Sequence, residues 1–324
     1  MVTVRFTERR GRVLTPSALA CLSSVPTVNV SCGCVHGCVY CYTRGYSQYP
    51  GEGTVLVYRD PAARVERELA RKRRKPTAAY FCPSCDAFQP VEAVLEETYR
   101  TMRVLFEAGV GVEFVTKGAV PGRFLGLFSR HPGRVSAQVG VTTLDDSLRA
   151  ALEPGAAPVG ERLLNISRLT DAGVSVAVRA DPLIYGVTDG DSGLAALMAA
   201  CRERGVTDVA ASYLFLRPAI TAGLKRHVVD RELLERILAP YRHPARVRLR
   251  GGAGRVAALP LAVRSAAYDR LRALAEACGM TLRVCGCKNP DLADERCQLT
   301  QTHDTLGSRG RSGPPRERLL WDAV

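Results

Sequence analysis

The stretch NVSCGCVHGCVYCYTRGY, residues 29–46, crowds several thiols into one short loop. Its four cysteines are Cys32, Cys34, Cys38 and Cys41. Gly33 and Gly37 lie between them and break a helix, so the cysteines are not the buried stripe of an amphipathic helix. Disulfides, zinc, a redox pair and an iron–sulfur cluster would each account for such a group, and the rest of the chain has to decide among them.

The composition of the whole chain helps to decide among disulfides, a redox pair and a metal site for these cysteines. It has 324 residues, of which 46% are hydrophobic, enough for one large domain or one domain with an extension. No apolar run is long enough to cross a membrane, and the first residues lack the apolar stretch of a signal peptide. We therefore expect a soluble, cytoplasmic protein with no membrane partner. Because that compartment keeps thiols reduced, the twelve cysteines favour metal binding or catalysis over disulfides.

The net charge of +13 is compatible with nucleic acid, nucleotides or acidic substrates as partners. Most of the positive charge is arginine, and the abundance of Arg, Ala, Gly and Val is typical of GC-rich coding sequence, so the charge alone is a weak indication. The densest basic run, RELARKRRK at residues 67–75, is more simply explained as a solvent-exposed helix face than as a phosphate-binding one.

Strand-like and helix-like segments alternate about six times between residues 26 and 217. The runs 78–81, 112–116 and 174–178 are examples of the strands. This alternation predicts parallel βα units, which right-handed crossovers curl into a barrel or an open sheet. We therefore predict an α/β fold with a full or partial TIM-like barrel, in which the chemistry lies at the carboxyl ends of the strands. The cysteine loop follows the first strand and belongs to that end.

Beyond the barrel the alternation weakens, and we predict four parts of the chain. Residues 1–25 form an N-terminal extension and residues 26–217 the barrel. Residues 218–305 form a C-terminal extension with further cysteines, and residues 306–324 a flexible tail rich in Gly, Ser, Arg and Pro.

Cys34, Cys38 and Cys41 have the spacing C-x3-C-x2-C. Zinc usually takes four ligands from two CxxC-type knuckles, and no matching knuckle lies nearby in the sequence. Three thiolates on a four-iron cluster leave one iron without a protein ligand, whereas an electron-carrying cluster usually has four cysteine ligands. The triplet therefore favours a catalytic iron–sulfur cluster.

A CxxxCxYC loop after the first strand of a βα barrel resembles the radical S-adenosylmethionine (SAM) superfamily. Later segments, in the same order, resemble the branch that contains spore photoproduct lyase and its uncharacterised relatives. These segments are CDAFQPVE (85–92), FVTKG (114–118), VGVTTLDDSLRAALEPGAAPVGERLLNISRLTDAGVSV (139–176) and DPLIYGVTD (181–189). The resemblance implies a partial (β/α)6 TIM-like barrel of the radical SAM type, followed by a C-terminal extension that contains cysteines.

The resemblance also implies cofactors and a mechanism. Cys34, Cys38 and Cys41 would ligate a four-iron, four-sulfur cluster whose open iron binds the amino and carboxylate groups of SAM. One electron from a donor such as flavodoxin or ferredoxin would cleave the sulfonium bond. The resulting 5′-deoxyadenosyl radical would take a hydrogen atom from the substrate, while the protein supplies position and excludes water.

Several residues match positions that contact SAM in the family. They are Tyr40 beside the adenine, Asp86 and Glu92 in the segment that lines the amino group, Lys117 facing the carboxylate, and Thr142 and Thr143 at the end of the fourth strand. Gly140 stands where relatives often carry serine. Plainer interpretations exist: packing for Tyr40, a helix start for Glu92 and a surface position for Lys117.

Three more residues are candidates for catalysis. Arg179 and Asp181 end the fifth strand, on the face of the barrel where substrate or SAM would bind, although a structural Arg–Asp pair fits equally well. Cys85 closes the motif Cys82-Pro-Ser-Cys85 and stands where relatives tend to have a hydroxyl residue. This CxxC could donate a hydrogen atom, ligate a second metal or simply be buried.

A second group of cysteines, Cys285, Cys287 and Cys297, has the spacing C-x-C-x9-C. In an extended chain the first two side chains share one face and the third is far away, so a loop wrapped around a metal is needed to gather them. An auxiliary iron–sulfur cluster is the leading hypothesis, with Cys82, Cys85 or Cys32 as a candidate fourth ligand. A structural zinc or a single catalytic thiol are the alternatives.

We therefore expect a radical SAM enzyme that acts on a small molecule or peptide in the biosynthesis of a specialised metabolite. The alternative substrate is nucleic acid, as in a lyase that splits a thymine dimer or a tRNA-modifying enzyme. The branch resemblance and the +13 charge favour nucleic acid, whereas an aromatic content of only 6% argues against it. A metal-binding nucleic-acid module without catalysis is the third hypothesis.

Overall fold

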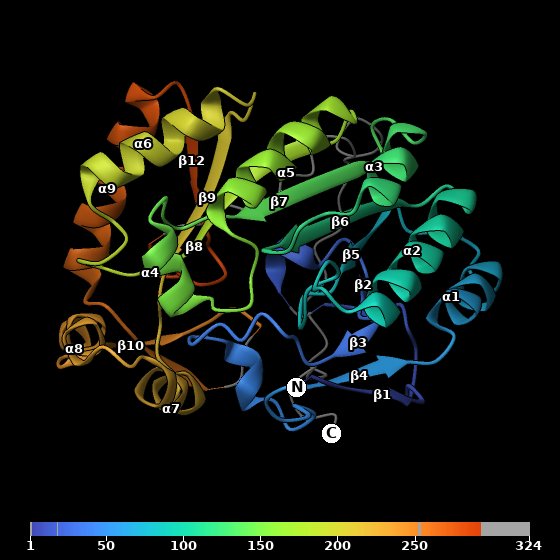
Figure 1. Ribbon diagram of the computed structural model, residues 1–324, viewed down its shortest axis with the longest axis horizontal. Helices are drawn as coiled ribbons and strands as arrows, with labels where there is room; N and C mark the ends of the chain where they lie inside the picture. Colours follow the sequence, from blue (N-terminus) through green and yellow to red (C-terminus); the bar gives the residue numbers. More distant parts are fainter. Residues whose placement is uncertain (1, 18, 252–253, 293–324) are drawn as a thin grey trace.

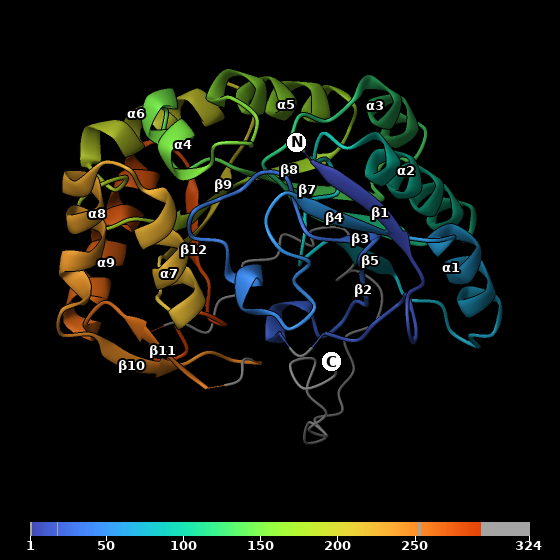
Figure 2. The same cartoon turned by 60° about the horizontal axis from the view of Figure 1, so that its bottom comes forward.

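The computed structural model describes residues 2–17, 19–251 and 254–292. Its main feature is a parallel sheet of seven strands in the order β12-β9-β8-β7-β6-β5-β2. The strands are β2 (Thr27–Val28), β5 (Ala78–Phe81), β6 (Gly111–Thr116), β7 (Val135–Gly140), β8 (Ser175–Leu183), β9 (Asp208–Tyr213) and β12 (Thr281–Val284). In the described part of the chain, β2 and β12 are the two edges, so the sheet is an open arc (Figure 2). The prediction of an α/β fold with a partial TIM-like barrel is confirmed.

Helices cover the convex side of this arc (Figures 1 and 2). The described helices are α1 (Pro61–Ala70), α2 (Glu92–Glu107), α3 (Gly122–Ser129), α4 (Asp146–Leu152), α5 (Val159–Asp171), α6 (Asp191–Arg202), α7 (Pro218–His227), α8 (Arg231–Leu238) and α9 (Leu261–Ala277). Of these, α7 does not lie on the convex side but packs against the 3-10 helix η2 (Tyr42–Gly45). In α2, Val94, Met102 and Leu105 recur at helical spacing and are buried. Such apolar stripes pack the helices onto the sheet and leave the charged residues outside.

Alternation along each strand separates the two faces of the sheet. Phe114 of β6 faces the helices, where its ring lies 5.8 Å from that of Phe128 in α3, centroid to centroid. Its neighbours in the strand, Glu113 and Val115, therefore face the concave side. Glu113 is only 3% exposed, and no residue that the structure describes donates a hydrogen bond to either carboxylate oxygen. Burial raises its pKa to about 7.

The N-terminal residues contribute to two places. β1 (Thr3–Thr7), β4 (Thr54–Tyr58) and β3 (Ser31–Cys32) form a small sheet in the order β1-β4-β3. The 3-10 helix η1 (Ala20–Leu22) lies against the concave face of the large sheet, where Leu22 packs in one apolar cluster with Tyr80 and Ala210.

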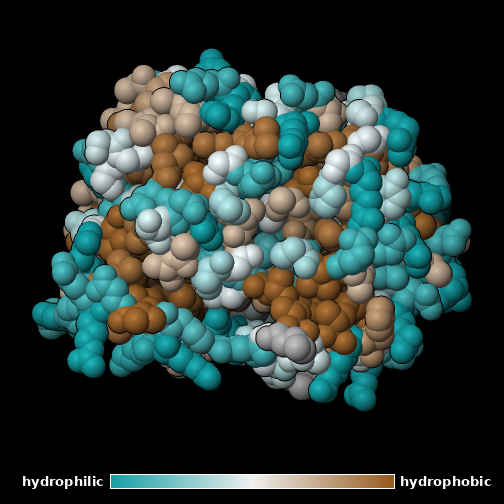
Figure 3. Space-filling model, in the orientation of Figure 1, coloured by the Kyte–Doolittle hydropathy of each residue, from teal (hydrophilic) through white to brown (hydrophobic). Residues whose placement is uncertain are grey.

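Figure 3 shows one face of the molecular surface. Hydrophilic residues lie toward its left and right edges, and hydrophobic residues gather between them.

The segment after the barrel returns to the same sheet. After α8, the 3-10 helix η3 (Ala239–Tyr241) leads to the antiparallel pair β10 (Ala245–Arg248) and β11 (Arg255–Ala258). Then α9 leads to β12, which pairs in parallel with β9. The tail predicted at residues 306–324 lies outside the described residues. None of the helices in the described part of the chain is long and apolar enough to cross a membrane.

Candidate active site

The cysteine loop connects β3 to the 3-10 helix η2 (Tyr42–Gly45) and follows the carboxyl end of β2. It carries Cys34, Cys38 and Cys41, and all three residues are partly exposed. Burial raises the pKa of the Cys34 thiol well above its usual value and that of Cys38 to about 12. Such thiols stay protonated at neutral pH until a metal ion displaces the proton.

Backbone packs closely around this loop at three glycines. A side chain at Gly33 would overlap the backbone of β4, and one at Gly155 would overlap the carbonyl oxygen of Val35. At Gly223 of α7 a Cβ would lie 2.7 Å from the carbonyl oxygen of Val39, closer than packed atoms approach. The loop is therefore held by β4, by the segment after α4 and by α7.

The three thiols fit an iron–sulfur cluster better than a single metal ion. Within residues 2–17, 19–251 and 254–292, no group of three or more His, Cys, Asp or Glu side chains gathers closely enough to hold one ion. In a cluster each thiolate binds a different iron, so the sulfur atoms lie farther apart than around one ion. The donor set on this closely packed loop thus fits the cluster, and Cys34, Cys38 and Cys41 would hold it.

Tyr40 and Lys117 lie beside a buried carboxylate, Glu153. The Tyr40 hydroxyl donates a hydrogen bond to Glu153 Oε1, and Lys117 Nζ lies 3.8 Å from the same oxygen. Arg162 Nη2 lies 2.5 Å from Glu153 Oε2. Burial alone would raise the pKa of Glu153, but Lys117 and Arg162 hold it below its usual value. Glu153 is therefore ionised and fixes both cations.

Lys117 reaches this position because Gly140 of β7 leaves room for it. A Cβ at Gly140 would lie 2.9 Å from Lys117 Cγ. The side chain of Lys117 thus packs over Gly140, the position at which the resemblance leads us to expect serine. Lys117 Nζ also donates a hydrogen bond to the carbonyl oxygen of Asp181 at 3.4 Å. The lysine therefore bridges from the side of the cysteine loop to the end of β8.

Asp86 is buried and accepts hydrogen bonds from the chain itself. Its Oδ1 accepts from Phe88 N and Thr116 Oγ1, and its Oδ2 from Lys117 N, each at 2.8 Å. His36 Nδ1 of the cysteine loop lies 3.4 Å from Oδ2. Asp86 therefore ties the end of β6 to the loop, and its contact with the amino group of SAM stays a prediction.

Arg179 and Asp181 form an ion pair at the end of β8, with Arg179 Nη2 2.6 Å from Asp181 Oδ2. Lys288 follows Cys287 and places its Nζ 2.6 Å from each carboxylate oxygen of Asp181. Burial alone would raise the pKa of Asp181, but Lys288 and Arg179 hold it below its usual value. With Lys117, these side chains form one polar network across the mouth of the barrel.

Cys85 lies next to the cysteine loop. Ser31 Oγ of β3 donates to Cys85 Sγ, and Cys85 Sγ donates to the carbonyl oxygen of Ser31, both at 3.4 Å. A hydrogen bond with the Cys82 thiol and burial raise the pKa of Cys85 well above its usual value. Cys85 therefore stays a neutral thiol at neutral pH, the form that carries a transferable hydrogen.

Some predicted residues lie apart from this network or have local partners. Glu92 begins α2, and its carboxylate, with 73% of the side chain exposed, pairs with Arg123 of α3. This is the position that the helix-start interpretation predicts. Thr142 is buried beyond β7, and the Thr143 hydroxyl accepts a hydrogen bond from Asp145 N at 3.0 Å. Roles for these residues in SAM binding stay predictions.

The second group of cysteines is divided. Cys285 and Cys287 are buried on the concave face, in the same apolar cluster as Cys21 of η1. The backbone N of Cys21 lies 3.4 Å from Cys287 Sγ. Cys297 lies outside the described residues. A metal site made by Cys285, Cys287 and Cys297 stays a prediction.

Sequence reasoning missed Glu153, Arg162 and Lys288. The first two belong to a segment that resembles the family, but no spacing or motif singles them out. A signal for Lys288 was available, because only five of the 45 basic residues are lysines and this one directly follows a cysteine. Two of those five lysines, Lys117 and Lys288, meet around Asp181.

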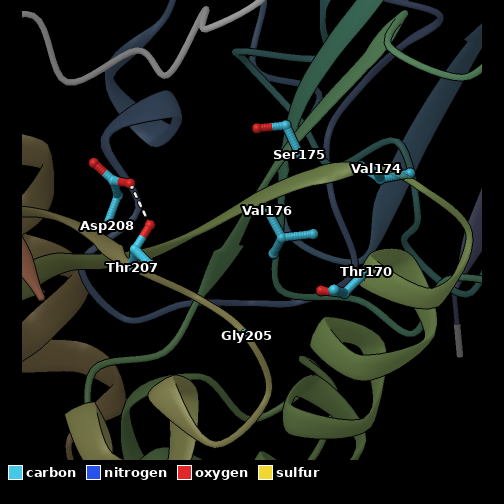
Figure 4. Close-up of a pocket in the computed structure, with 7 residues that line it drawn as sticks. All are labelled: Thr170, Val174, Ser175, Val176, Gly205, Thr207 and Asp208. Carbon is cyan, nitrogen blue, oxygen red and sulfur yellow. Dashed lines mark hydrogen bonds between the residues drawn. The ribbon is translucent and has the colours of Figure 1, made fainter. Parts of the chain in front are cut away.

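A shallow polar pocket lies away from this network, at the amino-terminal ends of β8 and β9 (Figure 4). Its lining residues are Thr170, Val174, Ser175, Val176, Gly205, Thr207 and Asp208. Within it, the Thr207 hydroxyl donates a hydrogen bond to Asp208 Oδ2 at 2.8 Å. The cysteine loop follows the opposite, carboxyl end of the strands, so this pocket is not the candidate active site.

Comparison with known proteins agrees with the geometry. The family model "Radical SAM superfamily" matches residues 28–198. The solved structure of a spore photoproduct lyase mutant with bound AdoMet and dinucleoside spore photoproduct matches with a TM-score of 0.66 and 16% identity, covering 86% of this chain and 81% of that one. At this identity the likeness concerns the fold alone.

Curated relatives are similar over shorter stretches. The "Radical SAM Nalpha-GlyT isomerase" of Pseudomonas phage M6 is 28% identical over 159 residues, which are 49% of this chain and 33% of that protein. An uncharacterized protein of Mycobacterium tuberculosis is 28% identical over 200 residues, 59% of either chain. The chain thus spans about three fifths or less of the length of these curated relatives.

Proposed function

The chain belongs to the radical SAM superfamily, and on that premise we propose that it is an enzyme that uses a four-iron, four-sulfur cluster and SAM to start a radical reaction. The proposed substrate is a small molecule or a peptide, in the biosynthesis of a specialised metabolite. One observation carries the proposal: three partly exposed thiols, Cys34, Cys38 and Cys41, lie on a closely packed loop that follows the first strand of a parallel barrel.

Bound at these thiols, the cluster would supply the electron that cleaves SAM, and SAM the radical that takes hydrogen from the substrate. The protein's own task is to bind and orient. Lys117 would pair with the carboxylate of SAM; its contacts with Glu153 and with the carbonyl oxygen of Asp181, at the end of β8, support this role. The Tyr40 ring, 5.8 Å from that ammonium, would lie beside the adenine.

Cys85 is proposed as the hydrogen donor. Its thiol would pass a hydrogen atom to a radical on the substrate, which forms a C–H bond, breaks the S–H bond and leaves a thiyl radical on Sγ. An electron from flavodoxin or ferredoxin and a proton would restore the thiol. The neutral state of Cys85 and its place beside Ser31, two residues before Gly33 in the cysteine loop, support this role.

An auxiliary iron–sulfur cluster is a second part of the proposal. Cys285 and Cys287 would be two of its ligands and Cys297 a third. Burial of the first two thiols on the concave face supports a centre that is shielded from water. A structural zinc would give the same thiol burial, so iron and zinc contents of the same sample decide between the two.

The test is reductive cleavage of SAM. Anaerobically reconstituted protein is reduced with dithionite and given SAM, and 5′-deoxyadenosine is measured. We expect product from the wild type and none from the triple variant Cys34→Ala/Cys38→Ala/Cys41→Ala. Cys278→Ala removes a thiol outside both cysteine groups and should keep the activity. Product from the triple variant, or none from the wild type, would reject the proposal.

Nucleic acid is the second candidate substrate, and the β10–β11 hairpin favours it. Arg246, Arg248 and Arg255 are exposed on this hairpin, and Arg248 and Arg255 are directly opposed across the two strands. None of the three makes an ion pair with another residue that the structure describes, although opposed like charges are unfavourable. Phosphates would neutralise them, so binding to DNA or RNA should weaken steeply with salt. Salt-independent or absent binding would reject this candidate.

A further inference from the structure

We propose that Lys288 forms a subsite that binds an acidic group of the substrate, a carboxylate or a phosphate, at the mouth of the barrel. This inference rests on the proposed function, because it concerns the substrate of that same site. It gives the second cysteine loop a role that does not depend on its thiols, namely to deliver a lysine into the active site.

The geometry leaves Lys288 able to bind a further anion. An ammonium group has three N–H donors. Two of them are directed at Asp181, since Nζ lies 2.6 Å from Oδ1 and 2.6 Å from Oδ2. No acceptor among the described residues takes the third, which leaves it for a ligand, and the Lys288 side chain is 26% exposed. The ring of Phe215, 5.7 Å from Nζ, forms an apolar wall beside the ammonium.

The balance of charge also favours an anion. Within the described residues, Asp181 pairs with Arg179 and Lys288, and Glu153 pairs with Lys117 and Arg162, so each carboxylate faces two cations. The carboxylates are 5% and 1% exposed, whereas Arg179 and Lys117 are 16% and 17% exposed. Lys117, Arg179 and Lys288 are thus more exposed than the carboxylates with which they pair, so a ligand that enters the mouth meets positive charge first.

Lys288 is held in place by its own loop. Arg264 of α9 pairs with both oxygens of Asp291, at 2.9 and 2.6 Å, and donates to Asn289 Oδ1 at 3.2 Å. Asn289 Nδ2 in turn donates to the carbonyl oxygen of Cys285 at 3.1 Å. The turn that carries Lys288 is thus fixed on both sides of the lysine, which reduces the entropy lost when a ligand binds.

The subsite is separate from the lysine proposed for SAM. Lys117 approaches Asp181 from the side of Tyr40 and bonds its carbonyl oxygen, whereas Lys288 approaches from β12 and bonds its carboxylate. The acid of SAM and the acid of the substrate would each have a cation of their own. Binding of an anion at Lys288 should therefore be compatible with bound SAM.

The experiment measures anion binding by calorimetry on the cluster-loaded protein saturated with SAM. Inorganic phosphate and acetate are the two probes, and the tighter one identifies the acidic group. We expect Lys288→Met to weaken the preferred probe on the order of 10- to 100-fold, the loss typical of one charged hydrogen bond. Lys75→Met removes the same charge from an exposed site and should change nothing. Lys288→Arg should restore part of the affinity.

Three results would overturn the subsite: no binding of either probe to the wild type, equal binding by Lys288→Met, or competition between the probe and SAM. Asp181→Asn gives an independent check, because it leaves Lys288 without its counter-charge and should keep or tighten anion binding. The same preparations are assayed for 5′-deoxyadenosine. Absence of that product in the wild type rejects the proposed function, whereas unchanged anion binding in Lys288→Met rejects the subsite alone.

Discussion

The two cysteine loops of this protein are built in different ways. In the loop at residues 29–46, Cys34, Cys38 and Cys41 are partly exposed, and glycines let the surrounding backbone hold them at the barrel mouth. In the loop after β12, Cys285 and Cys287 are 2% and 6% exposed and pack against η1 on the concave face. In this second loop Lys288, which lies between Cys287 and Asn289, is the residue that reaches the mouth of the barrel.

This difference shows that closely spaced cysteines do not by themselves identify the reactive group of a loop. Thiols that bind a catalytic cluster must leave space for a second molecule on one side. The first loop meets that requirement better than the second, since its three cysteines are partly exposed. In the second loop the thiols are enclosed by apolar side chains such as Tyr80 and Leu22, which suits a shielded metal centre or plain packing better than contact with substrate.

Metal content gives the largest expected contrast between the loops. We expect the triple variant Cys34→Ala/Cys38→Ala/Cys41→Ala to lose the about four irons of one cluster, because no other ligands replace three thiolates. Cys285→Ala/Cys287→Ala should keep those irons and lose only a second metal, iron or zinc. Iron, zinc and sulfide per chain are measured on anaerobically reconstituted samples. Equal iron loss in both variants would mean that the two loops share one cluster.

Packing around the first loop is the next difference to test. Gly223→Val would place a side chain against the carbonyl oxygen of Val39, where even a Cβ lies at 2.7 Å. We expect α7 and the loop to separate and the protein to lose more than half of its cluster absorbance, about 1–3 kcal/mol being typical of overpacking. Gly193→Ala in α6, where a Cβ meets nothing within 4 Å, is the control. Normal cluster loading in Gly223→Val would show that this contact is not needed.

The sequence predicted the first loop well because its signals are local. The spacing of three cysteines, the glycines between them and the strand before them all lie within a few residues. The same holds for the alternation that predicts the parallel sheet, and for Arg179 and Asp181, which are two positions apart and do form the pair that was one of their interpretations.

The rest of the site depends on contacts between distant segments, which have no local signal. Lys288 and Asp181 are 107 positions apart, and Cys21 and Cys287 are 266 apart. Nothing near Lys288 in the sequence indicates which strand β12 will pair with. Glu92 shows a nearer contact that the sequence did not indicate: the helix that it begins turns its side chain toward Arg123, and its place beside SAM stays a prediction.

Stability should reveal how firmly the second loop is held. Arg264→Met removes a buried guanidinium that pairs with Asp291 and bonds Asn289, and we expect a loss of about 2–4 kcal/mol of unfolding free energy. Arg272→Met on the same helix removes an exposed partner of Asp269 and should cost less than about 1 kcal/mol. Denaturant unfolding measures both. A loss no larger than in the control would mean that the loop does not depend on this pair.

The smallest expected effect is a change in the pH dependence of stability, caused by a buried carboxyl group on the concave face. It measures directly how well water is excluded from the surroundings of the second cysteine loop. Glu113 lies on that face, and burial raises its pKa from 4.5 to about 7. Below pH 4.5 the carboxyl is protonated in both the folded and unfolded states. As the pH rises toward 7, only the unfolded chain releases the proton, so folding loses on the order of 3 kcal/mol by pH 8. Glu113→Gln should therefore stabilise the protein at pH 8 and change little at pH 4.5, whereas Glu107→Gln on the exposed face of α2 should do neither. Equal stability of Glu113→Gln and wild type at pH 8 would mean that water reaches the face on which Cys285 and Cys287 lie, and that a shielded metal centre there is the wrong interpretation.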